Sequence, residues 1–449
     1  MNKKIFCFIH VVALILSLFY ELAYSSEIKN TEAEGKTSDN TNEELPTGVS
    51  KRGISEDVFG QKGGYFHPFL SITEFYSDNV FNNDKYKKSD FVTVISPGIW
   101  ITVPHVREKL LYIETSNISP GGFTISRHRY EFFKHYQTYL FYNADIERFS
   151  RFKEGNTTSH KLEGFLQYNT PGGLSAEIVE QFISSHDAWG TGISRELDKY
   201  KTNLVNLVFS YNLSERFKLR ADYSNFYVNY DAKRNNFRDR VDNVLAGYVF
   251  YKIKPKTSLF FEYEFMDIGY DKNILSDSLE HHYYGGLEWD ITAKSIGSIK
   301  LGYGVKDFSS SYIKDNNDFI FEVRLDHKFT PKTSLILKAT RRTEETNISA
   351  TYYIISNSIE AEYLQRITRK IQFYLGAFYS NENYKGKVFY NNIVSKIEDD
   401  YYRLAVALQY EFREWLKADL GYIYNKRSSS LSDFDYTTNI IFLRVTASL

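Results

Sequence analysis

Apolar and polar residues alternate through most of this chain in segments of ten to fourteen residues. Between Phe319 and Phe329, for example, apolar residues alternate with polar ones such as Glu322 and Arg324. The same two-residue period recurs over residues 402–412. Successive side chains of a β-strand point to opposite faces. Each segment therefore predicts a strand with one apolar face and one polar face.

The last of these segments is Asn439–Leu449, in which Ile441, Leu443, Val445 and Leu449 fall on one face. Inside a lipid bilayer every backbone N–H and C=O has to be paired within the protein, and among sheets only a closed barrel achieves this. We expect this segment to be the strand at which an antiparallel transmembrane β-barrel closes.

Short turns and longer polar loops alternate between the predicted strands. Residues 254–257 and 330–332 are examples of the turns, and residues 270–278 and 310–317 are examples of the loops. Such asymmetry is typical of outer-membrane barrels, in which short turns face the periplasm and long loops face outward. Counting strands from about residue 66 predicts an all-β, closed antiparallel barrel of about 18 strands, with 16 as the alternative.

The strand count depends on residues 105–134, a stretch longer than a hairpin turn requires. Both ends of the barrel chain are expected on the periplasmic side, so this stretch must add either no strand or an even number of strands to the wall. We interpret it as a periplasmic excursion or as an extra small hairpin around Ser119-Pro120-Gly121-Gly122.

A soluble sandwich or barrel would show the same alternation, with its apolar face turned inward. Three features favour a membrane barrel: segments near the length needed to span a bilayer, aromatic residues at segment ends, and an unbroken series of hairpins. Aromatic residues make up 17% of the chain, with 37 Tyr and 35 Phe. This abundance suits the aromatic belts that barrels place at both membrane interfaces.

The start of the chain has the features of an export signal, with basic residues, an apolar stretch and a small-x-small site at Ala23-Tyr24-Ser25. We predict a signal peptide over residues 1–25, a disordered periplasmic leader over 26–64, and an outer-membrane barrel over 65–449. The only cysteine, Cys7, lies in the apolar stretch, so the mature protein should contain no thiol.

Charge and motifs exclude several classes of function. The net charge of −1 gives no reason to expect a nucleic-acid partner. The sequence lacks the common nucleophile, zinc and phosphate-binding motifs. His281 and His282 are adjacent, and on a strand they would point to opposite faces, which is a poor arrangement for binding a metal. We therefore expect no enzymatic activity, no cofactor and no metal.

The polar faces of the predicted strands carry charged residues that would line the lumen. These candidates are Glu262, Glu264, Arg324, Lys328, Lys338, Arg342, Glu360, Glu362 and Arg403. Two successive basic strands precede an acidic strand, which suits a lattice of cross-strand salt bridges that stiffens the wall. The alternative is a charged constriction that selects a polar solute. Inward aromatic residues such as Tyr284, Tyr374 and Phe378 either fill volume or stack on sugar rings.

Several short motifs occur in an order that resembles a known family. The stretches 66–72, 76–81 and 89–98 read as a first strand, a Tyr-x-Asp-Asn-x-Phe loop and a second strand that ends in Pro-Gly. This resembles the opening of the putative beta-barrel porin 2 family. The Pro-Lys-Thr sequences at Pro255 and Pro331 resemble the recurring hairpin turn of the same family.

The resemblance covers residues 65–449 and implies an outer-membrane barrel of the kind often associated with exopolysaccharide synthesis and export. It implies no catalytic residues, and Leu449 departs from the terminal aromatic residue common in such barrels. We expect a channel that passes or supports export of extracellular polysaccharide, with a general diffusion porin or small-solute uptake channel as the alternative. Expected partners are outer-membrane lipid, the barrel assembly machinery and, for export, polysaccharide and periplasmic export components.

Overall fold

The structure is a computed structural model that describes residues 64–104, 113–127, 135–191, 196–292, 295–390 and 393–448. The predicted signal peptide and almost all of the predicted leader lie outside the described residues. The barrel belongs to the compact unit Asp39–Leu449. Within the described ranges, no helix is both long and apolar enough to cross a membrane.

The wall of the molecule is one antiparallel sheet of 18 strands. These strands are β1 (Phe66–Ser77), β2 (Asp90–Val103), β3 (Tyr136–Phe149), β4 (Thr157–Asn169), β5 (Leu174–His186), β6 (Lys199–Asn212), β7 (Phe217–Tyr230), β8 (Arg240–Lys254), β9 (Thr257–Tyr270), β10 (Ser278–Thr292), β11 (Ser295–Phe308), β12 (Asn316–Thr330), β13 (Thr333–Glu345), β14 (Thr351–Arg366), β15 (Ile371–Gly386), β18 (Glu398–Arg413), β19 (Leu416–Ser429) and β20 (Tyr436–Ser448).

Smaller elements lie in the connections between the wall strands. The strands β16 (Val388–Tyr390) and β17 (Ile393–Ser395) pair with each other in a separate two-stranded sheet. Short 3-10 helices occupy other connections, namely η3 (Pro120–Gly122), η4 (Lys153–Gly155), η5 (Lys233–Arg238), η6 (Ile274–Ser276) and η7 (Ser432–Phe434).

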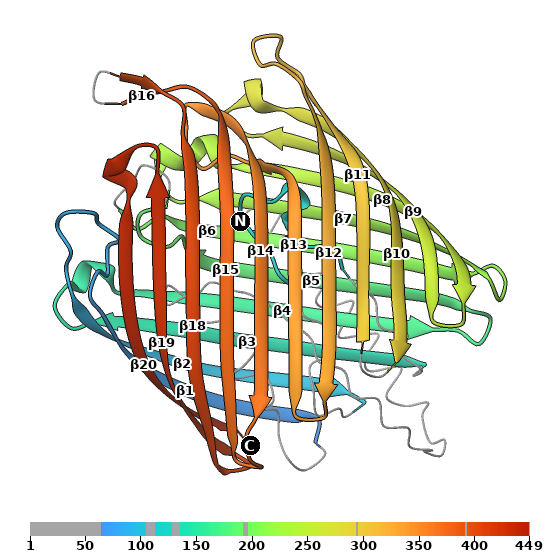
Figure 1. Cartoon of the computed structure of the whole chain (residues 1–449), viewed down its shortest axis with the longest axis horizontal. Helices are drawn as coiled ribbons and strands as arrows, with labels where there is room; N and C mark the ends of the chain where they lie inside the picture. The colour runs from blue at the N-terminus through green and yellow to red at the C-terminus, as the bar shows by residue number, and fades with distance from the viewer. Residues whose placement is uncertain are drawn as a thin grey trace, which may run out of the picture. The chain divides into compact units, whose positions relative to one another are not determined.

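The sheet closes on itself because β1 pairs with both β2 and β20, while every other wall strand pairs with its neighbours along the chain (Figure 1). In the closing pair, Ile72 lies opposite Val445, and Ser71 Oγ is 3.0 Å from Thr446 Oγ1. A closed sheet leaves no strand edge exposed to lipid. The predicted closed antiparallel barrel of 18 strands is confirmed.

Short and long connections alternate around the barrel. β8 ends at Lys254 and β9 begins at Thr257, whereas β1 ends at Ser77 and β2 begins only at Asp90. The short turns lie at the end of the barrel where β1 starts and β20 finishes, which by the usual asymmetry is the periplasmic end. The connection from β15 to β18 starts only after Gly386, where β15 ends.

The outer face of the wall is apolar, as lipid requires. Leu404, Leu420 and Leu443 are 41%, 58% and 49% exposed, respectively. Their chain neighbours Asp419 and Arg444 are buried on the opposite face. Because side chains alternate across a strand, hydrocarbon faces the leucines and the polar residues face the lumen.

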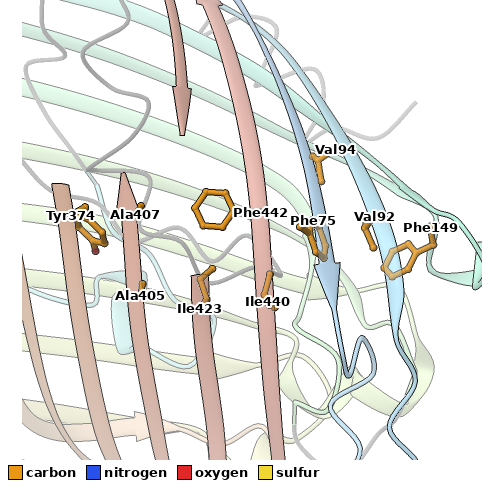
Figure 2. Packing of buried hydrophobic residues seen from close by; sticks show 10 residues of the cluster. All are labelled: Phe75, Val92, Val94, Phe149, Tyr374, Ala405, Ala407, Ile423, Ile440 and Phe442. Carbon is orange, nitrogen blue, oxygen red and sulfur yellow. The ribbon is translucent and has the colours of Figure 1, made fainter. Parts of the chain in front are cut away.

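The inner face is not polar throughout. Around the closing seam, β1–β3, β15 and β18–β20 contribute a buried apolar cluster that consists of Phe75, Val92, Val94, Phe149, Tyr374, Ala405, Ala407, Ile423, Ile440 and Phe442 (Figure 2). The ring of Phe442 lies over Gly421, where a Cβ atom would come within 2.4 Å of it. Side chains therefore pack on the lumen side of the seam, where the first and last strands meet.

Candidate functional site

Residues 113–127, which lie between β2 and β3, fold into the barrel rather than into its wall; we call them the tongue. One antiparallel bridge between Thr115 and Phe123 and the turn at Pro120–Gly122 give the tongue a hairpin-like shape. The sequence predicted either an extra hairpin or a periplasmic excursion over residues 105–134. The hairpin turn is present, but a periplasmic location is wrong for the tongue, because its contacts are with inward side chains of the wall.

Two glycines at the tip let the tongue approach the wall closely. Gly121 and Gly122 have φ angles of +68° and +84°, a region that residues with a Cβ atom rarely adopt. A Cβ atom on Gly121 would come within 2.5 Å of Val244, and one on Gly122 would come within 2.5 Å of the Phe226 ring. Only glycine fits at either position.

Hydrogen bonds fix the tip near the extracellular start of β8. Arg240 donates from Nη1 to the carbonyl oxygen of Asn117 (2.8 Å) and from Nη2 to that of Ser119 (3.2 Å). The amide of Gly121 donates to Asp242 Oδ2 at 2.9 Å. β8 begins at Arg240, directly after a long loop, so the tip of the tongue lies in the extracellular half of the lumen.

The returning arm of the tongue is held by charged side chains. Arg127 Nη2 lies 2.7 Å from Glu177 Oε2 on β5. The amide of Ser126 donates to Glu322 Oε2 at 3.0 Å, and Lys300 Nζ donates to Ser126 Oγ at 2.7 Å. Both arms of the tongue are thus tied to the wall by polar contacts.

Three predicted lumen residues meet at the tongue. Lys338 on β13 forms ion pairs with Glu114 of the tongue and with Glu360, its direct cross-strand neighbour on β14, at 3.3 Å. Arg342, also on β13, forms an ion pair with Glu344 and donates to the carbonyl oxygen of Phe123 at 2.8 Å. Here wall charges serve both the predicted lattice and the attachment of the tongue.

The other predicted lumen residues also lie on inward faces. Their polar partners include Lys300 for Glu262 (2.9 Å), His282 for Glu264 (3.1 Å), Asp326 for Arg324 (3.2 Å), Tyr374 for Glu362 (3.5 Å) and Asn425 for Arg403 (3.2 Å). Lys328 lies on the same face of β12 as Arg324, closer to the turn that ends the strand. Tyr284 packs against Lys300, whose Nζ is 4.1 Å from the ring centroid.

A polar cavity of about 420 Å³ remains between the tongue and the strands β3–β5, β13–β15, β18 and β19. Carboxylates such as Glu147 and Glu360 and cations such as Lys161 and Arg403 line it together. A smaller cavity of about 70 Å³ lies on the other side of the tongue, against β6–β13. The tongue therefore divides the lumen, and the larger space carries charges of both signs.

Long loops pack together at the extracellular end of the tongue. Ile118 of the tongue packs on a cluster that includes Ile348 and Val388. Arg238 Nη1 lies 2.7 Å from Asp187 Oδ2 and so joins the β7–β8 loop to the β5–β6 loop. Burial alone would lower the pKa of Arg238, but the Asp187 carboxylate raises it above its ordinary value, so this loop contact keeps its charge.

The sequence alone did not identify Glu114, Ser126 or Arg127 as lumen residues. Their stretch shows no two-residue period, and its only local signal is the turn at Ser119–Gly122. Among the described residues, no group of three His, Cys, Asp or Glu side chains is arranged to hold a metal ion.

Known structures resemble the chain in fold. The outer membrane protein OpdK of Pseudomonas aeruginosa aligns with a TM-score of 0.42 at 10% identity, over 86% of this chain and 98% of that one. The FrpB iron transporter of Neisseria meningitidis gives 0.41 at 8% identity, over 85% and 81%. Pseudomonas aeruginosa OccK2 (OpdF), solved in complex with glucuronate, gives 0.43 at 8% identity, over 86% and 98%. A comparison with curated proteins found no significant match.

The sequence also matches a family model, described as Putative beta-barrel porin 2, over residues 191–449. The matched region is more than half of the chain and runs from the loop before β6 through the closing strand β20. An apolar outer face, charged side chains in the lumen and periplasmic short turns place this barrel in the bacterial outer membrane. The chain belongs to the putative beta-barrel porin 2 family and is an outer-membrane β-barrel porin.

Proposed function

We propose that this porin passes small polar solutes of either charge through the cavity between the tongue and the β13–β19 side of the wall. The observation that supports this best is the size and lining of that cavity, about 420 Å³ with mixed charge. Pockets for small molecules typically have about 300–1,000 Å³. A lining that carried charges of one sign would favour ions of the opposite sign, whereas here Lys161 and Arg403 line the cavity together with Glu147 and Glu360.

The test is ion and solute flux through purified protein. In planar bilayers the protein should form steady, weakly selective channels, and proteoliposomes should swell in small sugars and amino acids but not in large oligosaccharides. Protein that is folded in detergent but gives neither current nor swelling, with the tongue present or deleted, would refute the proposal. The proposed function is diffusion, which requires no enzymatic step.

A second candidate is polysaccharide passage, and it rests on aromatic residues. Phe378, Tyr401 and Tyr436 line the same cavity, and aromatic faces can stack on sugar rings. With the tongue in the lumen, however, a polymer would have to pass through a space of small-molecule size. Deleting the gene should reduce secreted polysaccharide if this function holds. Unchanged amount and composition of that polysaccharide would rule it out without affecting the small-solute proposal.

A further inference from the structure

We infer that the tongue is a displaceable gate that leaves its wall contacts to join the two cavities into one wide passage. This inference rests on the proposed channel function and adds regulation to it.

The tongue is attached by side chains rather than by a strand ladder. Among the described residues, its backbone makes one backbone–backbone hydrogen bond to the wall, from the amide of Glu345 to the carbonyl oxygen of Ile118 at 2.6 Å. Every wall strand, in contrast, is paired on both sides without it. Moving the tongue therefore breaks no sheet pairing, and the barrel stays closed.

Three wall cations that hold the tongue keep an anionic neighbour when the tongue departs. Lys338 keeps Glu360, and Arg240 keeps Asp242, whose Oδ1 is 3.1 Å from its Nε. Lys300 likewise keeps Glu262 at 2.9 Å. A buried charge that loses its only partner destabilises a protein by about 3–5 kcal/mol. Arg240, Lys300 and Lys338 avoid this loss because each has a carboxylate on the barrel itself.

The space on the two sides of the tongue would become continuous. Thr340 and Arg342 on β13 line both the larger and the smaller cavity, so the two cavities meet the same part of the wall, with described residues of the tongue lining each of them. Removal of the tongue would expose the inward side chains of β6–β13 to the same passage as those of β14–β19. The open state would then admit solutes larger than the closed state admits.

The tip of the tongue also connects the gate to the outside. Ile118 packs on the apolar cluster of the extracellular loops, which includes Ile348 and Ile397. Withdrawal of Ile118 removes one apolar contact from that cluster. We therefore expect the loops to loosen when the tongue leaves, so that the inner constriction and the outer mouth open together.

The experiment is to lock the tongue reversibly. Thr115 Oγ1 lies 3.0 Å from Gln181 Oε1 on β5. Because cysteine is shorter than glutamine, Thr115→Cys and Gln181→Cys are joined by a short bis-thiosulfonate reagent, which forms one disulfide with each thiol, and Cys7 is the only natural cysteine. Single-channel recordings of the unlinked protein should show a low and a high conductance level. The disulfide link should abolish the high level, and reductant should restore it, while each single variant should behave like the wild type.

A second variant pushes the tongue outward instead. Gly122→Val would drive a side chain into the Phe226 ring and should increase occupancy of the high level at least several-fold. Gly247→Val is the matched control, because nothing lies within 4 Å of its Cβ position. A single level that neither disulfide nor Gly122→Val alters would show that the tongue is a fixed part of the wall. Should Gly122→Val fail to fold, the disulfide result decides alone. Loss of all conductance in every variant, including one without the tongue, would instead refute the channel function.

Discussion

Two adjacent residues of β18 allow a sharp test of which face of the barrel meets lipid. Leu404 is 41% exposed on the outer face and lies near the middle of Glu398–Arg413. Replacing it by arginine places a charge in hydrocarbon, at about 2–4 kcal/mol at the bilayer midplane and less toward the interfaces. From the position of Leu404 we expect Leu404→Arg to lower the free energy of unfolding by about 2–3 kcal/mol.

The neighbouring change, Arg403→Leu, should be much milder. Arg403 points into the lumen, where its Nε donates to Asn425 Oδ1 at 3.2 Å and its guanidinium lies 5.9 Å from the Phe378 ring centroid. Loss of one such hydrogen bond reduces stability by about 0.5–1.5 kcal/mol. Leu404→Arg adds a positive charge and Arg403→Leu removes one. Both should lower the free energy of unfolding, and Leu404→Arg should lower it by more.

The assay is equilibrium unfolding in urea with the barrel in lipid vesicles, followed by the fluorescence of its four tryptophans. Leu404→Val serves as the control, since it changes shape but not polarity on the lipid face. Equal losses for Leu404→Arg and Arg403→Leu, or a larger loss for Arg403→Leu, would show that the inner and outer faces have been assigned the wrong way round.

Three further outcomes follow from the lumen, the loops and the seam. Lys338→Gln removes the cation between two carboxylates and should shift the reversal potential in a KCl gradient toward cation selectivity, whereas the outward-facing Arg341→Gln should not; an unchanged potential would mean that Lys338 does not face the conducting path. Arg238→Ala breaks the loop contact to Asp187 and should increase cleavage of extracellular loops by protease added to intact cells, and unchanged cleavage would contradict that role. Deleting residues 436–449 removes the closing strand and should abolish the folded, heat-modifiable band in gel electrophoresis; a folded band would mean that closure does not need β20.

The wall could be predicted from the sequence because its signal is local. Each strand carries its own two-residue period, and neighbouring strands follow one another along the chain, so the alternation around Phe319 or Tyr402 is sufficient to place the faces. The nine predicted lumen residues lie on inward faces for the same reason. Their partners were harder to predict, since Arg324, for example, pairs with Asp326 on its own strand.

The tongue could not be predicted because its contacts are remote in sequence. Glu114 and Lys338 are separated by 224 residues, and Gly121 and Asp242 by 121. Neither side of these contacts has a pattern that points to the other. Gly121 and Gly122 indicated a turn, but the close approach that requires glycine there depends on Phe226 and Val244, which belong to other strands.

Hydrogen bonds from wall side chains to backbone carbonyl groups of the tongue explain how a segment without strand pairing can stay inside a barrel. Buried carbonyl groups need hydrogen-bond donors, and wall arginines supply them: Arg220 to the carbonyl of Arg127 at 3.3 Å, Arg240 to that of Asn117 and Arg342 to that of Phe123, both at 2.8 Å. Because these bonds end on backbone oxygens, they do not depend on which side chains the tongue carries. The wall therefore holds the tongue in part through its backbone, in addition to the side-chain contacts of Glu114 and Arg127.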